Sequence, residues 1–335
     1  MTAAQVAFAQ KVAFLRRPAA YPEDPAEVEA VQTHMSWVFL TASHAYKLKK
    51  PVHDPYRDLR QVEQRRHHAE DEVRLNRRLA GDVYLGTVPL YHGLQGLSLT
   101  EGDRVVDWLV RMRRLPAAAS LEAVIRDGRA DRAALRPVLE RLAAFYREAP
   151  SAGFSGPGYR ERFARDLRTE RESLAGRVSG PTLERACAAC EAFLCRRAAL
   201  LEARAAAGRV VEGHGDLRPE HIYLTEPPVI IDCLEFSREL RLLDPADELA
   251  FLGLECERLG APGPGRCLPE LYREASGDRP DRVLFDFYGA FRALVRARLA
   301  AVHAEDPAMD HGRHWRRRAE DYLQRAVDAA ERALG

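Results

Sequence analysis

The residues best suited to chemistry lie in one stretch of the chain, from Val210 to Asp232. It opens on the turn His214-Gly215-Asp216, and Asp232 follows 16 residues after Asp216, behind two short apolar runs typical of β-strands. In phosphoryl transfer one aspartate orients the attacking hydroxyl and another holds Mg²⁺ on the phosphates. The stretch therefore predicts a catalytic loop over residues 212–224 and a metal-binding carboxylate at Asp232.

Strand patterns fill the part of the chain before this stretch. Residues 28–40 are apolar around a turn at 33–36, and residues 45–52 alternate so that Lys47 and Lys49 share one face. A helix is predicted over 59–79, followed by strands at 85–91, 97–100 and 103–112. These patterns predict a five-stranded antiparallel sheet with one helix.

Helical patterns dominate from Pro116 onwards, apart from the two short strands after Asp216. The glycine-rich segments 153–158 and 260–265 are predicted to be loops, and the first lacks a phosphate-binding motif. The change of pattern near 111–116 predicts two lobes: an N-lobe of residues 1–112 and a helical C-lobe of residues 113–335. A short hinge there would join the lobes across a cleft.

Composition narrows the class of protein. The 335 residues are 46% apolar and 30% charged with a net charge of +1, which is ordinary for a soluble globular protein and gives no reason to expect nucleic-acid or membrane binding. The sequence shows neither a signal peptide nor a run of 18 apolar residues, so we expect a cytoplasmic protein. Cys187 and Cys190 form a C-x-x-C inside a helical pattern without further ligands at zinc spacing, which favours thiols packed as small apolar groups.

Lysine is rare in this chain. Of 51 basic residues only four are lysines, and three of these lie within four positions, Lys47, Lys49 and Lys50. The cluster indicates a place that needs a compact ammonium group rather than a guanidinium, although a chance cluster at a strand end gives the same pattern.

Several runs of residues resemble a known family. Asp216-Leu-Arg-Pro-Glu-His221 resembles the protein-kinase catalytic loop Asp-Leu-Lys-Pro-Glu-Asn, and its His-Gly-Asp opening resembles that of aminoglycoside phosphotransferases. Residues 33–299 are similar to this small-molecule kinase family, which implies an α+β, protein-kinase-like fold of two lobes. The runs Thr-His-Met-Ser-Trp-Val-Phe-Leu-Thr, Tyr-Lys-Leu-Lys-Lys-Pro-Val and Glu-Val-Arg-Leu-Asn-Arg-Arg-Leu resemble an uncharacterised bacterial branch often fused to a P-loop kinase domain. The chain shows no G-x-x-x-x-G-K-[ST], so we expect a stand-alone form.

The resemblance implies roles for residues of the N-lobe. Lys47 matches the strand lysine that pairs with the nucleotide phosphates, and Lys49 is the alternative if the register differs by two. Glu72 matches the helix glutamate that orients this lysine. Glu70 is the alternative residue for this role, and a solvent-exposed helix face without a functional role also explains the pattern.

The loop between the first two strands has to approach the phosphates. Thr33, His34 and Ser36 are its candidate ligands, and no glycine-rich cradle accompanies them.

In the C-lobe, the resemblance makes Asp216 the group that orients the acceptor hydroxyl and Arg218 a cation near the transferred phosphate. Asp232 becomes the principal metal ligand, with Glu235 as a weaker addition. His221 stands where these kinases usually place an Asn that binds a second metal. An imidazole suits Mn²⁺ better than Mg²⁺, so His221 is a candidate metal ligand that puts two-Mg²⁺ chemistry in question.

A further acidic segment follows this stretch. Asp244 and Asp247 are expected to cap the helix that begins near Ala246 and to brace the catalytic loop.

Together these features predict a phosphotransferase that uses ATP or GTP with Mg²⁺ or Mn²⁺ and acts on a hydroxyl of a small molecule, such as an aminoglycoside, sugar or amino alcohol. Alternatives are a pseudokinase-like nucleotide-binding module, which His221 favours, nucleotidyl transfer on the same fold, and a metallohydrolase built on the histidines and aspartates of the stretch. The acceptor is not defined by the sequence, because one fold hosts many acceptors.

Overall fold

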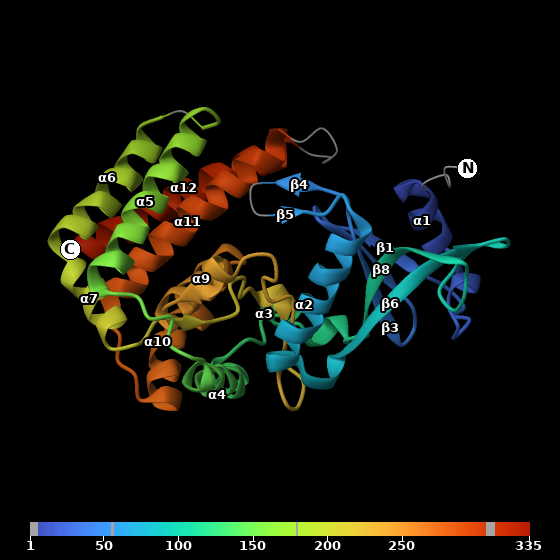
Figure 1. Ribbon diagram of the computed structural model, residues 1–335. Coiled ribbons are helices and arrows are strands. Elements are labelled where there is room, and N and C mark those ends of the chain that lie inside the picture. The colour runs from blue at the N-terminus through green and yellow to red at the C-terminus, as the bar shows by residue number, and fades with distance from the viewer. Residues whose placement is uncertain (1–5, 55–56, 179, 306–311) are drawn as a thin grey trace. The chain divides into compact units, whose positions relative to one another are not determined.

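The computed structural model describes residues 6–54, 57–178, 180–305 and 312–335 (Figure 1). The chain divides into two compact units. The first comprises Met1–Ala119 together with Val229–Arg238, and the second comprises Ser120–Pro228 and Glu239–Gly335. The first unit thus continues past the predicted boundary at residue 112 and also takes in the short segment that contains Asp232.

The first unit is built on a six-stranded antiparallel sheet in the order β1-β2-β3-β8-β6-β7. The strands are β1 (Glu29–Gln32), β2 (Ser36–Leu40), β3 (His44–Lys49), β6 (Tyr84–Gly93), β7 (Gly96–Ser98) and β8 (Arg104–Arg113). The sheet has six strands instead of the predicted five because the run 28–40 turns back on itself at residues 33–35 and forms both β1 and β2. A separate small pair consists of β4 (His53–Asp54) and β5 (Arg57–Asp58).

Two helices accompany this sheet, α1 (Phe8–Leu15) and α2 (Val62–Ala80), and α2 packs on β6 and β8. Strand alternation separates the side chains of β3. Tyr46 and Leu48 join the apolar cluster that contains Leu15 of α1, whereas Lys47 and Lys49 point to the opposite face. Two lysines therefore meet the helix α2 rather than the apolar core.

The second unit is mainly helical. Its helices are α3 (Leu121–Arg126), α4 (Arg132–Glu148), α5 (Gly156–Ala175), α6 (Pro181–Arg196), α7 (Ala198–Ala206), α9 (Pro245–Arg258), α10 (Pro262–Ser276), α11 (Arg282–Glu305) and α12 (Gly312–Leu334). The short helix α8 (Arg238–Arg241) precedes β12 (Leu242–Leu243), which pairs with β9 (Val211–Glu212). The two short strands predicted around residues 222–231 are β10 (Ile222–Tyr223) and β11 (Val229–Ile230).

The long antiparallel helices α11 and α12 lie side by side and pack on α6 and α9 (Figure 1). Their core includes Phe193 and Phe287, whose rings stack with centroids 4.3 Å apart. Both glycine-rich segments predicted as loops are partly helical. Ser155 caps α5 by accepting the amide of Gly158, and prolines near the first turn allow α5 and α10 to begin early.

A buried arginine joins α7 to the start of α9. Arg204 donates to both carboxylate oxygens of Asp244 at 2.6 and 2.7 Å and to both oxygens of Asp278 at 2.7 Å. Asp244 also caps α9 by accepting the amide of Ala246, as predicted. Removal of one partner would leave the other buried charges uncompensated, so each charge requires the others to stay in place.

The cysteines give a direct test of this packing. Burial raises the pKa of Cys187 to about 11 and that of Cys256 to about 12, while Cys195 is exposed. Because the thiolate is the reactive form, we expect a thiol reagent at pH 8 to modify Cys195 rapidly and the buried Cys187, Cys190 and Cys256 only after denaturant is added. Mass spectrometry of the labelled peptides measures this, and Cys195→Ser should remove the rapid phase. Rapid labelling of Cys190 in the native protein would contradict the buried position of α6.

Candidate active site

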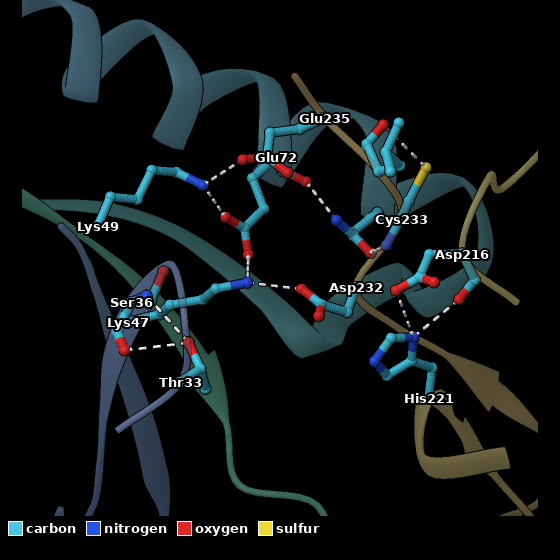
Figure 2. A network of polar contacts seen from close by, with 12 residues as sticks. Thr33, Ser36, Lys47, Lys49, Glu72, Asp216, His221, Asp232, Cys233 and Glu235 are labelled. Carbon is cyan, nitrogen blue, oxygen red and sulfur yellow. Dashed lines mark hydrogen bonds and ion pairs between the residues drawn. The ribbon is translucent and has the colours of Figure 1, made fainter. Parts of the chain in front are cut away.

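A chain of ion pairs crosses the candidate site of the first unit (Figure 2). Lys47 Nζ lies 2.5 Å from Asp232 Oδ1 and 2.9 Å from Glu72 Oε1. The other oxygen of Glu72 accepts from Lys49 at 2.5 Å, and Lys49 also reaches Glu235 at 2.7 Å. The order is therefore Asp232, Lys47, Glu72, Lys49, Glu235. Two strand lysines share one helix carboxylate, so both lysines weighed from the sequence belong to the same cluster.

The two lysines differ in exposure. The Lys47 side chain is 15% exposed and contacts Asp232, whose side chain is 39% exposed. The Lys49 side chain is 4% exposed and lies between those of Glu72 and Glu235, which are 0% and 11% exposed. Lys47 is thus the lysine that an incoming anion can reach, and Lys49 holds the carboxylate behind it.

Burial and neighbouring charges act against each other on these groups. Burial lowers the pKa of Lys47, but Asp232 and Glu72 outweigh it and raise this pKa well above its ordinary value. Burial likewise lowers the pKa of Lys49, but Glu235 and Glu72 outweigh it and raise this pKa above its ordinary value. Burial raises the pKa of Glu235, yet Lys49 and Lys47 hold it below its usual range. Both lysines therefore stay charged around neutral pH.

The segment that carries Asp232 is held by its backbone. The Asp232 amide donates to Tyr84 Oη at 3.2 Å, and the Cys233 amide donates to Asn76 Oδ1 at 2.8 Å. Asp232 has φ = 61°, a left-handed conformation that aspartate tolerates better than most residues. Asn76 and Tyr84 were not predicted as site residues. Asn76 lies four positions after Glu72, on the same face of α2, and that spacing is the signal that would have found it.

The β1–β2 turn is closed by its own polar groups. Ser36 donates its amide to Thr33 Oγ1 at 2.9 Å, and the Thr33 hydroxyl donates to the Ser36 carbonyl at 3.0 Å. Ser36 begins β2 and is only 2% exposed, so it lies in the sheet rather than on the loop. In this structure neither residue adds a polar group to the Lys47 cluster.

In the second unit, one buried carboxylate shapes the catalytic loop. Glu248, with no exposed surface, accepts the amides of His214 at 3.1 Å and Gly215 at 2.5 Å and the hydroxyl of Tyr146 at 2.6 Å. A side chain at Gly213 would collide with this carboxylate at 2.9 Å, which explains the glycine there. The brace expected from Asp247 is therefore wrong. Glu248 supports the loop instead. The Asp247 side chain does not take this role, because it makes a bidentate pair with Arg292.

Asp216 lies between cationic and polar neighbours on this loop. Arg218 contacts Asp216 Oδ2 at 3.0 Å and Glu220 at 2.7 Å, and it reaches His221 Nε2 at 3.1 Å. A guanidinium only donates, so Nε2 of His221 must accept and its Nδ1 must carry the hydrogen that is donated to the Asp216 carbonyl at 2.9 Å. His214 braces the loop in a similar way, because its Nδ1 accepts the Asp216 amide at 3.3 Å.

These arrangements decide which residues fit a divalent cation. Asp232 offers hard carboxylate oxygens with the greatest exposure in its cluster, which suits Mg²⁺. His221 does not fit as a metal ligand in this arrangement, because both of its ring nitrogens are engaged by the loop itself. Within the described ranges, no three His, Cys, Asp or Glu side chains are grouped so as to hold a metal ion.

Comparison with known structures identifies the fold. The chain resembles the GDP complex of aminoglycoside 2′-phosphotransferase-IIIa with a TM-score of 0.51 at 14% identity, over 91% of this chain and 93% of that one. It resembles a choline/ethanolamine kinase family protein from Mesorhizobium loti with a TM-score of 0.50 at 15% identity, over 97% and 99% of the two chains. A putative aminoglycoside phosphotransferase from Ralstonia eutropha matches equally well, at 0.50 and 15%, over 92% and 93%. The chain therefore has the aminoglycoside-phosphotransferase-like, protein-kinase-like fold, as predicted.

Among curated sequences, the chain is similar to two uncharacterized proteins, Rv2004c of Mycobacterium tuberculosis and Mb2027c of Mycobacterium bovis. Each is 34% identical over 282 residues, which cover 82% of this chain and 55% of the relative. The chain thus spans about half the length of the curated relatives it matches. No family model matches the sequence. In the described part of the chain, none of the helices has the length and apolar character needed to cross a membrane.

The shared carboxylate can be tested by stability alone. Glu72→Ala would leave Lys47 and Lys49 without their common partner, and the loss of one member of a buried charge cluster costs about 3–5 kcal/mol. We expect a corresponding fall in the free energy of unfolding measured with urea. Glu70→Ala is the matched control on the same helix, because Glu70 pairs only with exposed Arg66 among the described residues, and it should change little. Equal effects of the two substitutions would contradict the cluster.

Proposed function

We propose that this protein is a phosphotransferase that moves the γ-phosphate of a nucleoside triphosphate to a hydroxyl group of a small molecule. The observation that carries the proposal is the linked order Asp232, Lys47, Glu72, in which a helix carboxylate fixes a strand lysine beside an exposed aspartate. The kinase fold of the structural neighbours supports it, and one of these neighbours, aminoglycoside 2′-phosphotransferase-IIIa, is a GDP complex.

The residues of the first unit suit a nucleotide triphosphate. Lys47 is a charged ammonium on a rigid strand, held by Glu72, and it can exchange its contact with Asp232 for phosphate oxygens. Asp232, once released, can bind a divalent cation, which would neutralise charge on the β- and γ-phosphates. Lys49 keeps Glu72 in place while this exchange occurs.

The catalytic loop suits the acceptor. Asp216 accepts a hydrogen bond from the acceptor hydroxyl and orients its oxygen. As the bond from this oxygen to the γ-phosphorus forms, the bond to the β–γ bridging oxygen breaks, a nucleoside diphosphate leaves and the hydroxyl proton passes towards Asp216. Arg218, already beside Asp216, supplies a positive charge that favours the transferred group.

A second candidate is a nucleotide-binding module without transfer. It is favoured by His221, whose nitrogens are engaged by Arg218 and the loop backbone and leave no ligand for a second cation at that position. The two candidates differ in turnover and share nucleotide binding, so substitution of Asp216 separates them.

The first prediction of the proposal concerns Asp216. Asp216→Ala should leave nucleotide affinity nearly unchanged and reduce transfer by a factor of about 10² to 10⁴, the range for loss of a positioned proton acceptor. Nucleotide consumption with a panel of hydroxylated metabolites measures transfer, and fluorescence of a labelled nucleotide measures binding. Undiminished turnover in the variant would refute this mechanism, and a wild type that binds but never turns over would favour the binding module.

The second prediction concerns the cation. Asp232→Ala should abolish the rise in melting temperature that Mg²⁺ or Mn²⁺ adds to that produced by nucleotide alone, because the hard oxygen ligand is lost. Thermal unfolding with nucleotide, with and without the cation, measures it. Asp82→Ala, an exposed residue paired with Arg113 in the same unit, is the control and should keep the full cation effect. An unchanged cation effect in Asp232→Ala would place the metal elsewhere.

A further inference from the structure

Guanidinium groups and aromatic rings alternate across three helices of the second unit. Arg292 and Arg296 of α11 lie over the Phe251 ring of α9 at 5.5 and 5.9 Å. Arg296 and Arg318 lie over the Tyr322 ring of α12 at 5.6 and 5.9 Å, and Arg318 also lies over Trp315 at 5.2 Å. We call this the arginine–aromatic ladder: Arg292, Phe251, Arg296, Tyr322, Arg318 and Trp315. Such cation–π contacts attract a guanidinium to the ring face and favour its position there.

The ladder contains more positive than negative charge. Asp247 pairs with Arg292 at one end of the ladder. Glu255 is the inner carboxylate: it accepts from Tyr322 at 2.5 Å and from Arg258 at 2.8 Å, and it forms an ion pair with Arg296 at 3.3 Å. One carboxylate therefore serves two arginines. Arg318 has no carboxylate within ion-pair distance among the residues the structure describes, and its Nε is buried without a hydrogen-bond partner there.

Burial decides which charge meets the solvent. The side chain of Glu255 has no exposure, whereas those of Arg296 and Arg258 are 15% and 20% exposed. The carboxylate lies behind the guanidinium groups, so a ligand that arrives from solution meets cations. An ammonium group would be repelled there, while a phosphate or carboxylate matches the planar fork of donors.

The ladder lies next to the catalytic loop within the same unit. The short helix Pro219–His221 of the loop packs against α9, which carries Phe251 and Glu255. Burial lowers the pKa of Arg296, but Tyr322 and Glu255 raise it above its ordinary value; Arg218 and Asp216 of the loop have smaller, opposite effects. The loop of Asp216 and the helix α9 of the ladder are therefore in contact within the second unit.

We propose that the arginine–aromatic ladder is an anion subsite for the acceptor, in which Arg296 and Arg318 bind a phosphate or carboxylate group of the molecule that is phosphorylated. The proposed subsite rests on the proposed function and narrows the class of acceptor. The acceptor becomes a hydroxylated phosphate or a hydroxy acid instead of an amine or amino alcohol. The stacked rings fix the guanidinium groups before the ligand arrives, which lowers the entropy lost on binding.

Binding of inorganic phosphate tests the subsite without any turnover. Calorimetry is done on the full chain with saturating Mg²⁺ and a non-hydrolysable ATP analogue, so that the nucleotide phosphates are already present. We expect Arg318→Gln to weaken phosphate binding about tenfold, which is about 1.4 kcal/mol. Arg318→Lys should restore part of the affinity, because it keeps the charge but loses the fork.

The matched control is Arg316→Gln. Arg316 is an exposed residue of the same helix, and the structure gives it neither an ion pair nor a ring contact within the described residues. Both variants replace an arginine by glutamine, so the change in net charge is identical. Its phosphate affinity should stay within twofold of wild type. Equal weakening by both glutamine variants, or no phosphate binding by the wild type, would overturn the subsite.

A turnover assay with paired acceptors tests the link to transfer. Glycerol is compared with glycerol 3-phosphate, glucose with glucose 6-phosphate, and ethanolamine with glycerate. We expect nucleotide consumption with anionic members only, and Arg318→Gln to raise KM about tenfold with kcat little changed, as loss of uniform binding does. Preferred use of ethanolamine or glycerol would overturn the subsite and leave the proposed function intact. Arg318-dependent phosphate binding without turnover on any acceptor would support the subsite and contradict the proposed function.

Discussion

A carboxylate without solvent exposure, Glu72, is the constraint on which the candidate site depends. Its two oxygens serve two lysines of one strand, and these lysines in turn hold Asp232 and Glu235. A buried charge is stable only when it is paired, so the sheet, α2 and the segment of Asp232 must keep one another in place. Lys47, the lysine that we propose to bind phosphate, is thereby fixed before any ligand binds, which is how a rigid scaffold lowers the cost of positioning.

The second unit uses the same device twice. Glu248 takes two amides of the catalytic loop and a tyrosine hydroxyl, and Asp244 takes Arg204 while it caps α9. Asp244 is the N-cap of α9 and Glu248 lies in its first turn, so the start of this helix positions the loop. Loops that hold reactive groups gain precision when such buried partners fix their backbone. The ladder of α9, α11 and α12 then offers cations beside the loop, which gives the helices a role in choosing the acceptor.

Much of this could be predicted from patterns of short range. The alternation of β3 placed Lys47 and Lys49 on one face, and the structure confirms it, because the period of a strand is a local property. The scarcity of lysine also pointed to the cluster, although Lys11 is equally buried and pairs with Asp107 rather than with Glu72. The predicted sheet lacked one strand, because the prediction counts the run 28–40 as one strand despite the turn predicted inside it, and only the pairing of its two halves shows that each is a strand of its own.

The sequence by itself determined the residue types and their places along the chain: two lysines in one strand, a carboxylate on the following helix, and aspartates at a tight loop and at a strand end. Only the tertiary structure decided their partners. Lys47 and Asp232 are separated by 185 positions, and the ladder joins residues of three helices, so no local pattern encodes these contacts. The physical reason is that a side chain's role depends on its neighbours. The Arg218 guanidinium donates to Nε2 of His221, and this contact is set by packing rather than by residue type.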